Sequence, residues 1–214
     1  MLILAYQYFE QYEPNIFQEL AKIFSKTAIE VCEGQQYDVD FEREAQVSTD
    51  QYLKMIAYKT AVLVGAALKM GAIIAQTTEE NKQKIYDFGL ALGIAYQLQD
   101  DYLDTFGDDS FGKKIGGDIL QNKKTLLYLK ALEKGTAEQK QELYALYTNE
   151  PKNEDEKISR VTELFIATQS HTYLRERVEA YTMEAFAILD TLDIPLEKKD
   201  ILKEFGSSLM NRTI

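Results

Sequence analysis

Residues 79–106 read EENKQKIYDFGLALGIAYQLQDDYLDTF, and two patterns in this stretch decide how the chain folds. Apolar side chains recur at steps of three and four residues, which predicts one long amphipathic helix. The residues of this stripe are Ile85, Phe88, Gly89, Leu92, Tyr96, Gln99, Leu103 and Phe106. A second stripe lies beside it and changes from small and apolar to acidic; its residues are Leu90, Gly93, Ile94, Gln97, Asp100, Asp101 and Asp104. We therefore expect the central helix of a bundle, with one side facing a cavity.

Residues 15–42 repeat this design. Leu20, Phe24, Thr27 and Val31 share one helical face, which continues into Gln35 and Asp38. Two helices whose inner faces turn from apolar to polar predict an elongated pocket between them. Its charged mouth could hold a polar headgroup, and its dry shaft could hold a hydrocarbon tail.

The remaining chain predicts an all-α fold and a single domain over 1–214. Only three Pro and eleven Gly interrupt it, and there is no strand-like alternation or internal repeat. Helices are expected at about 2–12, 15–42, 49–76, 79–106, 119–133, 136–148, 154–168, 170–191 and 197–211. Ser48 or Thr49 is expected to cap the third, and Thr77 with Glu80 forms the pattern of a capping box before the fourth. Gly107 to Gly117 is expected to be a loop.

Composition excludes several classes of function. The net charge is −11, and nucleic-acid binding needs a basic surface. A single cysteine, Cys32, excludes an internal disulfide and favours a reducing compartment. The first residues lack the basic region and cleavage site of a secretory signal, and no run of about 18 apolar residues predicts a membrane span. We expect a cytoplasmic protein with no membrane span.

The aspartates at the end of 79–106 form a candidate metal site. Asp100 and Asp104 are four residues apart and share a helix face, and Asp101 lies close to Asp104. Their repulsion would weaken an isolated helix, whereas a divalent cation reverses that effect. Mg²⁺ typically binds one or two carboxylates together with substrate phosphates. The alternative is a solvated acidic face, although the apolar neighbours of these residues argue against it.

Lysines follow the aspartates at once. Lys113, Lys114, Lys123 and Lys124 lie within twelve residues of an otherwise acidic chain, with glycines between them. Glycine lets the backbone approach a phosphate, and lysine supplies a mobile positive charge. A solvated basic loop is the alternative, and the position directly after a metal-binding turn favours phosphate contact.

Together these residues resemble the trans-isoprenyl diphosphate synthases, the polyprenyl synthetase family that includes the farnesyl and geranylgeranyl diphosphate synthases. The resemblance runs from about Ile29 to Leu127. The family's second aspartate-rich motif is similar to residues 97–104, QLQDDYLD. Its other motifs resemble Gly34-Gln35-Gln36-Tyr37-Asp38, Lys59-Thr60 and the stretch Gly112 to Asp118 followed by Lys123 or Lys124. Four motifs in the right order are far more specific than any one of them.

The resemblance implies an isoprenoid-synthase helical bundle, usually a homodimer, and a head-to-tail condensation. In that reaction Mg²⁺ grips an allylic diphosphate, the C–O bond ionises, and the double bond of isopentenyl diphosphate attacks the allylic cation. By the same resemblance Asp100 would be the principal metal ligand, supported by Asp101 and Asp104, with Asp38 nearby. Lys59, Lys114 and Lys123 would bind the diphosphate. Gln35, Thr60 and Gln97 would lie against the reacting carbons.

The chain departs from the family pattern at its start. It opens in Met1-Leu2-Ile3-Leu4 without a capping residue, and the family's first aspartate-rich motif is not found. We therefore expect the C-terminal portion of the fold, without its N-terminal helices, and little synthase activity from these 214 residues alone. Two alternatives stay open: a terpene cyclase on the same scaffold, and a non-catalytic helical subunit.

Overall fold

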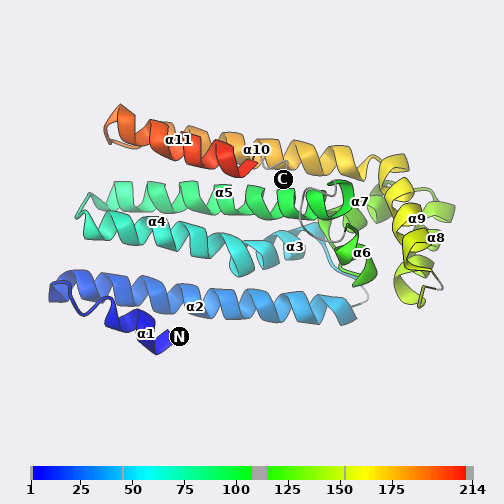
Figure 1. The fold of residues 1–214 in the computed structure, drawn as a ribbon, viewed down its shortest axis with the longest axis horizontal. Helices are drawn as coiled ribbons and strands as arrows, with labels where there is room; N and C mark the ends of the chain where they lie inside the picture. Colours follow the sequence, from blue (N-terminus) through cyan, green and yellow to red (C-terminus); the bar gives the residue numbers. More distant parts are fainter. Residues whose placement is uncertain (1, 45, 108–114, 152, 211–214) are drawn as a thin grey trace.

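The computed structural model describes residues 2–44, 46–107, 115–151 and 153–210, and within them the chain is all-α, as the sequence predicts. Long helices lie side by side along one axis, and shorter helices gather at one end of the molecule (Figure 1). The helices are α1 (Leu2–Gln7), α2 (Pro14–Arg43), α3 (Thr49–Ile56), η1 (Ala57–Ala61), α4 (Val62–Ile74), α5 (Glu79–Phe106), α6 (Gly117–Leu120), α7 (Leu126–Lys134), α8 (Ala137–Thr148), α9 (Glu154–Ala167), α10 (Ser170–Asp190) and α11 (Leu196–Met210).

The α5 helix is central, because α4 packs on one side of it and α10 on the other. Phe88 and Leu92 are buried against Leu189 of α10 and its neighbours. Ile94 and Leu98 belong to a larger core, formed with α3, α7, α9 and part of α10. The α5 helix is therefore buried on more than one side, as predicted for the central helix of the bundle. The polar end of the second stripe then reaches the end of the bundle where α6 to α9 lie (Figure 1).

Of the two helix caps predicted from the sequence, one is confirmed and one is wrong. Ser48 caps α3 in a reciprocal capping box with Gln51. The residue that caps α5 is Thr78, whose hydroxyl accepts from the Asn81 amide at 3.2 Å, so the prediction of Thr77 is wrong by one position. Thr77 instead accepts from the Asn81 side chain, and Glu80 pairs with Lys84 rather than reaching back to the backbone.

Three predicted helices have different bounds. The first ends at Gln7 rather than at residue 12. The stretch 49–76 contains a turn of π-helix, η1, between α3 and α4. The stretch 119–133 is divided into α6 and α7, because Asn122 has a left-handed backbone conformation (φ 56°) that ends the first helix.

Thr49–Ile74 is the one segment of the described residues that is long and apolar enough to cross a membrane, judged by length and composition alone. Lys59 and Lys69 interrupt it, which is why we predicted no span from the sequence. It packs against α2 and α5 inside the bundle. We interpret it as an interior helix of a helical protein rather than as a membrane span.

Candidate active site

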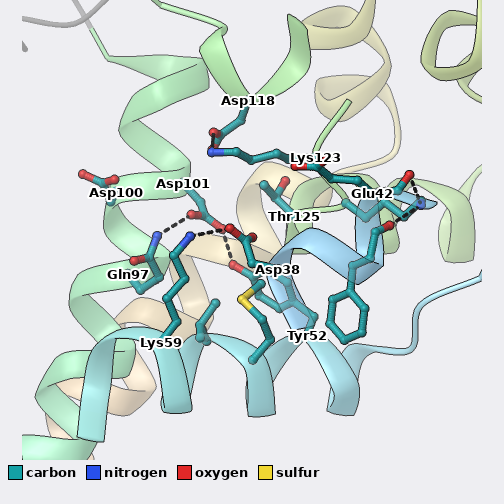
Figure 2. A pocket seen from close by; sticks show the side chains of 14 residues that line it. Asp38, Glu42, Tyr52, Lys59, Gln97, Asp100, Asp101, Asp118, Lys123 and Thr125 are labelled. Carbon is teal, nitrogen blue, oxygen red and sulfur yellow. Dashed lines mark hydrogen bonds and ion pairs between the residues drawn. The ribbon is translucent and has the colours of Figure 1, made fainter. Parts of the chain in front are cut away.

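A pocket opens where the carboxyl ends of α2 and α5 meet α3, η1 and the α6–α7 connection (Figure 2). Acids, lysines and a few apolar side chains share its wall. The lining residues are Asp38, Phe41, Glu42, Tyr52, Met55, Ile56, Lys59, Gln97, Asp100, Asp101, Asp118, Lys123, Lys124 and Thr125. The wall combines charged and apolar side chains, but none of the apolar residues predicted for a dry shaft, such as Leu20, Phe24 and Leu90, lines it.

Asp101 is the buried carboxylate of this pocket, with 5% of its surface exposed. Its Oδ1 accepts from the Gln97 side-chain amide at 2.9 Å, and its Oδ2 accepts from the buried Tyr52 hydroxyl. Burial raises the pKa of Asp101 to about 7, and the negative charge of Asp118 adds to the effect. A carboxyl in this state is held in place by its neighbours and resists ionisation until a positive charge arrives.

Asp104 joins α5 to α6. Its Oδ2 accepts from the Asp118 amide at 2.9 Å, and its backbone oxygen accepts from the Gly116 amide at 2.6 Å. Burial raises the pKa of Asp104 to about 6, again with help from the charge of Asp118. These bonds fold the start of α6 back onto the aspartate turn, and so a further acid is added to the cluster.

Two lysines face these acids. Lys59 donates to Asp38 at 2.5 Å, and Lys123 donates to Asp118 at 2.6 Å. Burial lowers the pKa of Lys123, but the hydrogen bond and the charge of Asp118 outweigh burial and raise it overall. About a third of each lysine side chain is exposed, 33% for Lys59 and 34% for Lys123. Both ammonium groups can therefore exchange a carboxylate for a ligand that enters the pocket.

The π-helical turn η1 carries Lys59 and Thr60. Turns of this kind are frequent at functional sites, because the extra residue changes which side chains face inward. The Thr60 hydroxyl donates to Gln97 Oε1 at 2.9 Å, so η1 and α5 are joined at the pocket. Gly34 of α2 packs directly against this turn. A Cβ at Gly34 would lie 2.3 Å from the backbone nitrogen of Lys59, so only glycine permits the approach.

Lys124 has a different role from its neighbour Lys123. It donates to the backbone oxygens of Phe41 and Glu44 at 2.5 Å each. Burial lowers the pKa of Lys124. A lysine on the last carbonyls of a helix satisfies acceptors that have no partner within the helix. Lys124 thus ties the end of α2 to the α6–α7 connection.

The structure brings together six of the residues predicted for the site, since Asp38, Lys59, Gln97, Asp100, Asp101 and Lys123 all line the pocket. Thr60 and Asp104 are one hydrogen bond away from its wall, through Gln97 and Asp118. Gln35 is exposed on α2 and does not line the pocket. Lys114 lies outside the described residues.

Two polar lining residues that contact the predicted aspartates, Tyr52 and Asp118, have no role predicted from the sequence. Tyr52 precedes Lys59 by two helical turns, so their shared helix face was a signal that could have indicated it. Asp118 closes the glycine-rich motif, but its contact with Asp104 depends on how the chain folds back. The sequence pattern alone does not contain that contact.

The donor set fits a metal that is shared with an anionic ligand. In the described part of the chain, no three His, Cys, Asp or Glu side chains converge closely enough to hold an ion by themselves. Mg²⁺ does not require such a cage, since one or two carboxylates, waters and phosphate oxygens suffice. Asp100 and Asp101 both line the pocket and can supply the carboxylate part of this set, although the Asp100 carboxylate lies apart from the other labelled acids in Figure 2.

Comparisons with known proteins identify relatives of this chain by sequence and by fold. A family model described as polyprenyl synthetase matches residues 1–165. A short chain isoprenyl diphosphate synthase of Methanothermobacter thermautotrophicus is 30% identical over 193 residues, which are 90% of this chain and 55% of that protein. A solved geranylgeranyl pyrophosphate synthase is 46% identical with a TM-score of 0.93, covering 98% of this chain and 65% of the other.

A third similar protein is the Corynebacterium glutamicum geranylgeranyl pyrophosphate synthase solved with isoprenyl diphosphate and magnesium. It is 28% identical with a TM-score of 0.85, and 94% of this chain matches 57% of that one. The chain therefore spans between 55% and 65% of the length of these three proteins.

Proposed function

Because the chain belongs to the polyprenyl synthetase family, we propose that its protein is a prenyltransferase, which condenses an allylic diphosphate with isopentenyl diphosphate head to tail. One observation carries the proposal: Asp100 and Asp101 of α5 share a pocket with Lys59 and Lys123, and one wall of that pocket is apolar. Such a pocket suits a ligand with a polyanionic head and a hydrocarbon tail. The magnesium and isoprenyl diphosphate in the Corynebacterium protein support the same assignment.

We assign the metal to Mg²⁺, held by Asp100 with support from Asp101, Asp104 and Asp38. When bound, Mg²⁺ neutralises the negative charge that builds up on the diphosphate as the C–O bond breaks. Asp101 and Asp104 contribute negative charge to the cluster and are fixed by Gln97, Tyr52 and the backbone of α6. The raised pKa values of Asp101 and Asp104 fit acids that await a cation.

Two lysines hold the diphosphate in this proposal. Lys59 and Lys123 leave Asp38 and Asp118 for the phosphate oxygens, and Lys114 adds a third charge. Fixed positive charges of this kind stabilise the pyrophosphate that departs with the electron pair of the C–O bond.

The hydrocarbon part of the substrate contacts a different wall. The Thr60 hydroxyl and the Gln97 amide, joined at 2.9 Å, direct their dipoles toward the allylic cation. Met55 and Ile56 keep water from that cation until the double bond of isopentenyl diphosphate attacks it. Loss of a proton from the adduct gives a chain one isoprene unit longer.

Chain elongation is favoured over a cyclase or a non-catalytic subunit, because each relative reported above is named as a prenyl diphosphate synthase. By the same family argument we propose a homodimer. The single cysteine, Cys32, supports a cytoplasmic location.

The test is calorimetric titration of a prenyl bisphosphonate into the protein with and without Mg²⁺. The wild type is expected to bind only with Mg²⁺, and Asp100→Ala is expected to bind at least about 30-fold more weakly, since one charged ligand interaction is worth about 2 kcal/mol. Asp87→Ala, an acid on the same helix but away from the pocket, is the matched control and should bind like the wild type. Equal affinity of wild type and Asp100→Ala would remove the metal site from this pocket.

A further inference from the structure

The α9 helix lines no part of the pocket. Its first turns pack against α6 and the residues that follow it, a segment that carries Asp118 and Lys123. Lys157 is almost fully buried, with 3% of its surface exposed. Its ammonium donates to Asn122 Oδ1 at 2.5 Å and lies 5.5 Å from the centre of the Tyr147 ring. A residue remote from the pocket thus contacts the immediate neighbour of Lys123.

The charged form of Lys157 is unfavourable at this position. Burial alone lowers its pKa, since no carboxylate among the described residues offsets the lost hydration. The ammonium loses hydration here without gaining an opposite charge, and a methionine of similar size would fill the space without that loss. What the ammonium supplies and methionine lacks is a directed hydrogen bond to Asn122.

Asn122 has an unfavourable backbone conformation that contacts with other residues must stabilise. Its φ of 56° is in the left-handed region, which asparagine tolerates better than most residues but still adopts at a cost. Its amide bonds to Ile119 at 3.1 Å, and the next amide, of Lys123, bonds to Asp118 at 2.9 Å. This turn ends α6 and directs the Lys123 side chain to Asp118 at 2.6 Å.

The next residue of α9 holds the other end of α6. Ile158 packs against Gly116, where a Cβ would be 2.7 Å from the isoleucine Cγ1 and where φ is 79°. Gly116 in turn donates to Asp104 at 2.6 Å. Consecutive residues of α9 therefore contact both ends of α6, one end next to the aspartates and one next to Lys123.

We propose that Lys157 is a positioning residue for Lys123: through Asn122 it fixes the turn that presents the Lys123 ammonium to a diphosphate in the pocket. The role in binding a diphosphate rests on the proposed function. The structural part of the inference, that Lys157 sets the environment of Lys123, rests only on the contacts described above and is tested separately.

The first experiment is competitive acetylation of the lysines, read for each residue by mass spectrometry. Lys157→Met and Asn122→Gly should each raise the labelling rate of Lys123 several-fold, because its bond to Asp118 is held less firmly. The glycine keeps the left-handed turn accessible and removes only the acceptor. Lys130→Met is the matched control, since Lys130 is also buried, at 8% exposure against 3% for Lys157, but pairs with Glu133. Unchanged labelling of Lys123 in Lys157→Met would overturn the inference.

The second experiment measures Mg²⁺-dependent binding of inorganic pyrophosphate by calorimetry. Lys157→Met should weaken binding about fivefold, the value of one hydrogen bond of about 1 kcal/mol. In the Lys123→Ala background the same substitution should have almost no further effect, whereas a general loss of stability would persist there. Additive losses, or faster labelling with unchanged pyrophosphate affinity, would refute a role in diphosphate binding. If the wild type fails to bind pyrophosphate, the proposed function falls, and the labelling result still decides whether Lys157 positions Lys123.

Discussion

The two ends of α5 differ in how their buried charged groups are neutralised. Near its start, Lys82 is buried with 5% of its surface exposed, and two acids neutralise it: Glu19 of α2 and Glu79 of the same turn, each at 2.7 Å. The hydrogen bonds that Lys82 donates to Glu19 and Glu79 raise the pKa of Lys82. Every charge in this cluster has its partner within the protein.

At the other end, among the described residues of the pocket, the acids outnumber the lysines. Asp101 and Asp104 have pKa values raised to about 7 and about 6 by burial and by the nearby charge of Asp118. The lysines of this pocket already pair with Asp38 and Asp118. The hydrogen bonds that Asp101 and Asp104 accept come from the Tyr52 hydroxyl, the Gln97 amide and the Asp118 backbone amide, which are uncharged donors.

The difference separates a structural charge cluster from a binding site. A cluster that serves the fold satisfies its own groups, because an unpaired buried charge reduces stability. A cluster that serves a ligand stays unbalanced, and the protein is less stable until the ligand binds. The comparison predicts that substitutions at the start of α5 alter stability alone, while substitutions at its end alter binding.

Lys59→Met should produce the largest effect. Loss of the ammonium removes one of the charges that meet the diphosphate, and we expect Mg²⁺-dependent pyrophosphate affinity to fall about 100-fold, close to 3 kcal/mol for a charge-assisted contact. Calorimetric titration measures it. Lys69→Met is the matched control, since Lys69 lies on the continuation of the same helix but contacts Gln83 and Tyr86 instead. Similar losses in both variants would mean that general charge, rather than this pocket, binds the anion.

Asp101→Asn should stabilise the metal-free protein at high pH. Between the ordinary pKa of 3.8 and about 7, the folded state keeps a proton that the unfolded state has released. The free energy of unfolding of the wild type therefore falls as pH rises through this range and levels off above it. Asparagine cannot ionise, and it can still bond to Tyr52 and Gln97. We expect the variant to gain about 2 kcal/mol at pH 8 and nothing at pH 4, with part of the repulsion screened by water in the pocket.

Urea denaturation in EDTA at several pH values measures this effect. Asp104 keeps its own raised pKa, so a shallower decline should persist in the variant. A wild-type stability that rises between pH 5 and pH 8 would contradict the unbalanced charge at this end of α5. Adding Mg²⁺ with pyrophosphate should restore stability to the wild type more than to the variant.

The sequence predicted the helices whose apolar spacing is regular, and both bounds of α5 are as expected. The division of 119–133 was not predicted, because it depends on the left-handed conformation of Asn122, whose side chain accepts a hydrogen bond from Lys157 in a distant part of the chain. The π-helical turn was missed for a related reason. Apolar spacing shows which face is buried, but it does not show a local change in hydrogen-bond register.

The site was predictable where one helix face or one motif contains the information. Asp100, Asp101 and Gln97 share α5, and the Lys59-Thr60 pair carried the family resemblance. Their metal and substrate roles remain predictions. Gln35 was placed wrongly on the inner face, because its neighbour Gly34 is the residue that packs against η1, and successive helix positions point about 100° apart.

Lys82→Met should produce the smallest effect and complete the comparison. The substitution removes both ion pairs of Lys82, but Glu19 and Glu79 are 42% and 81% exposed and regain water, so we expect a loss of about 1 kcal/mol in the free energy of unfolding. Pyrophosphate affinity should stay within about twofold of the wild type, because the cluster lies at the far end of α5. Urea denaturation and calorimetry measure the two quantities. A tenfold loss of affinity with unchanged stability would show that charge at this end also serves the ligand, and the distinction between the two ends would fail.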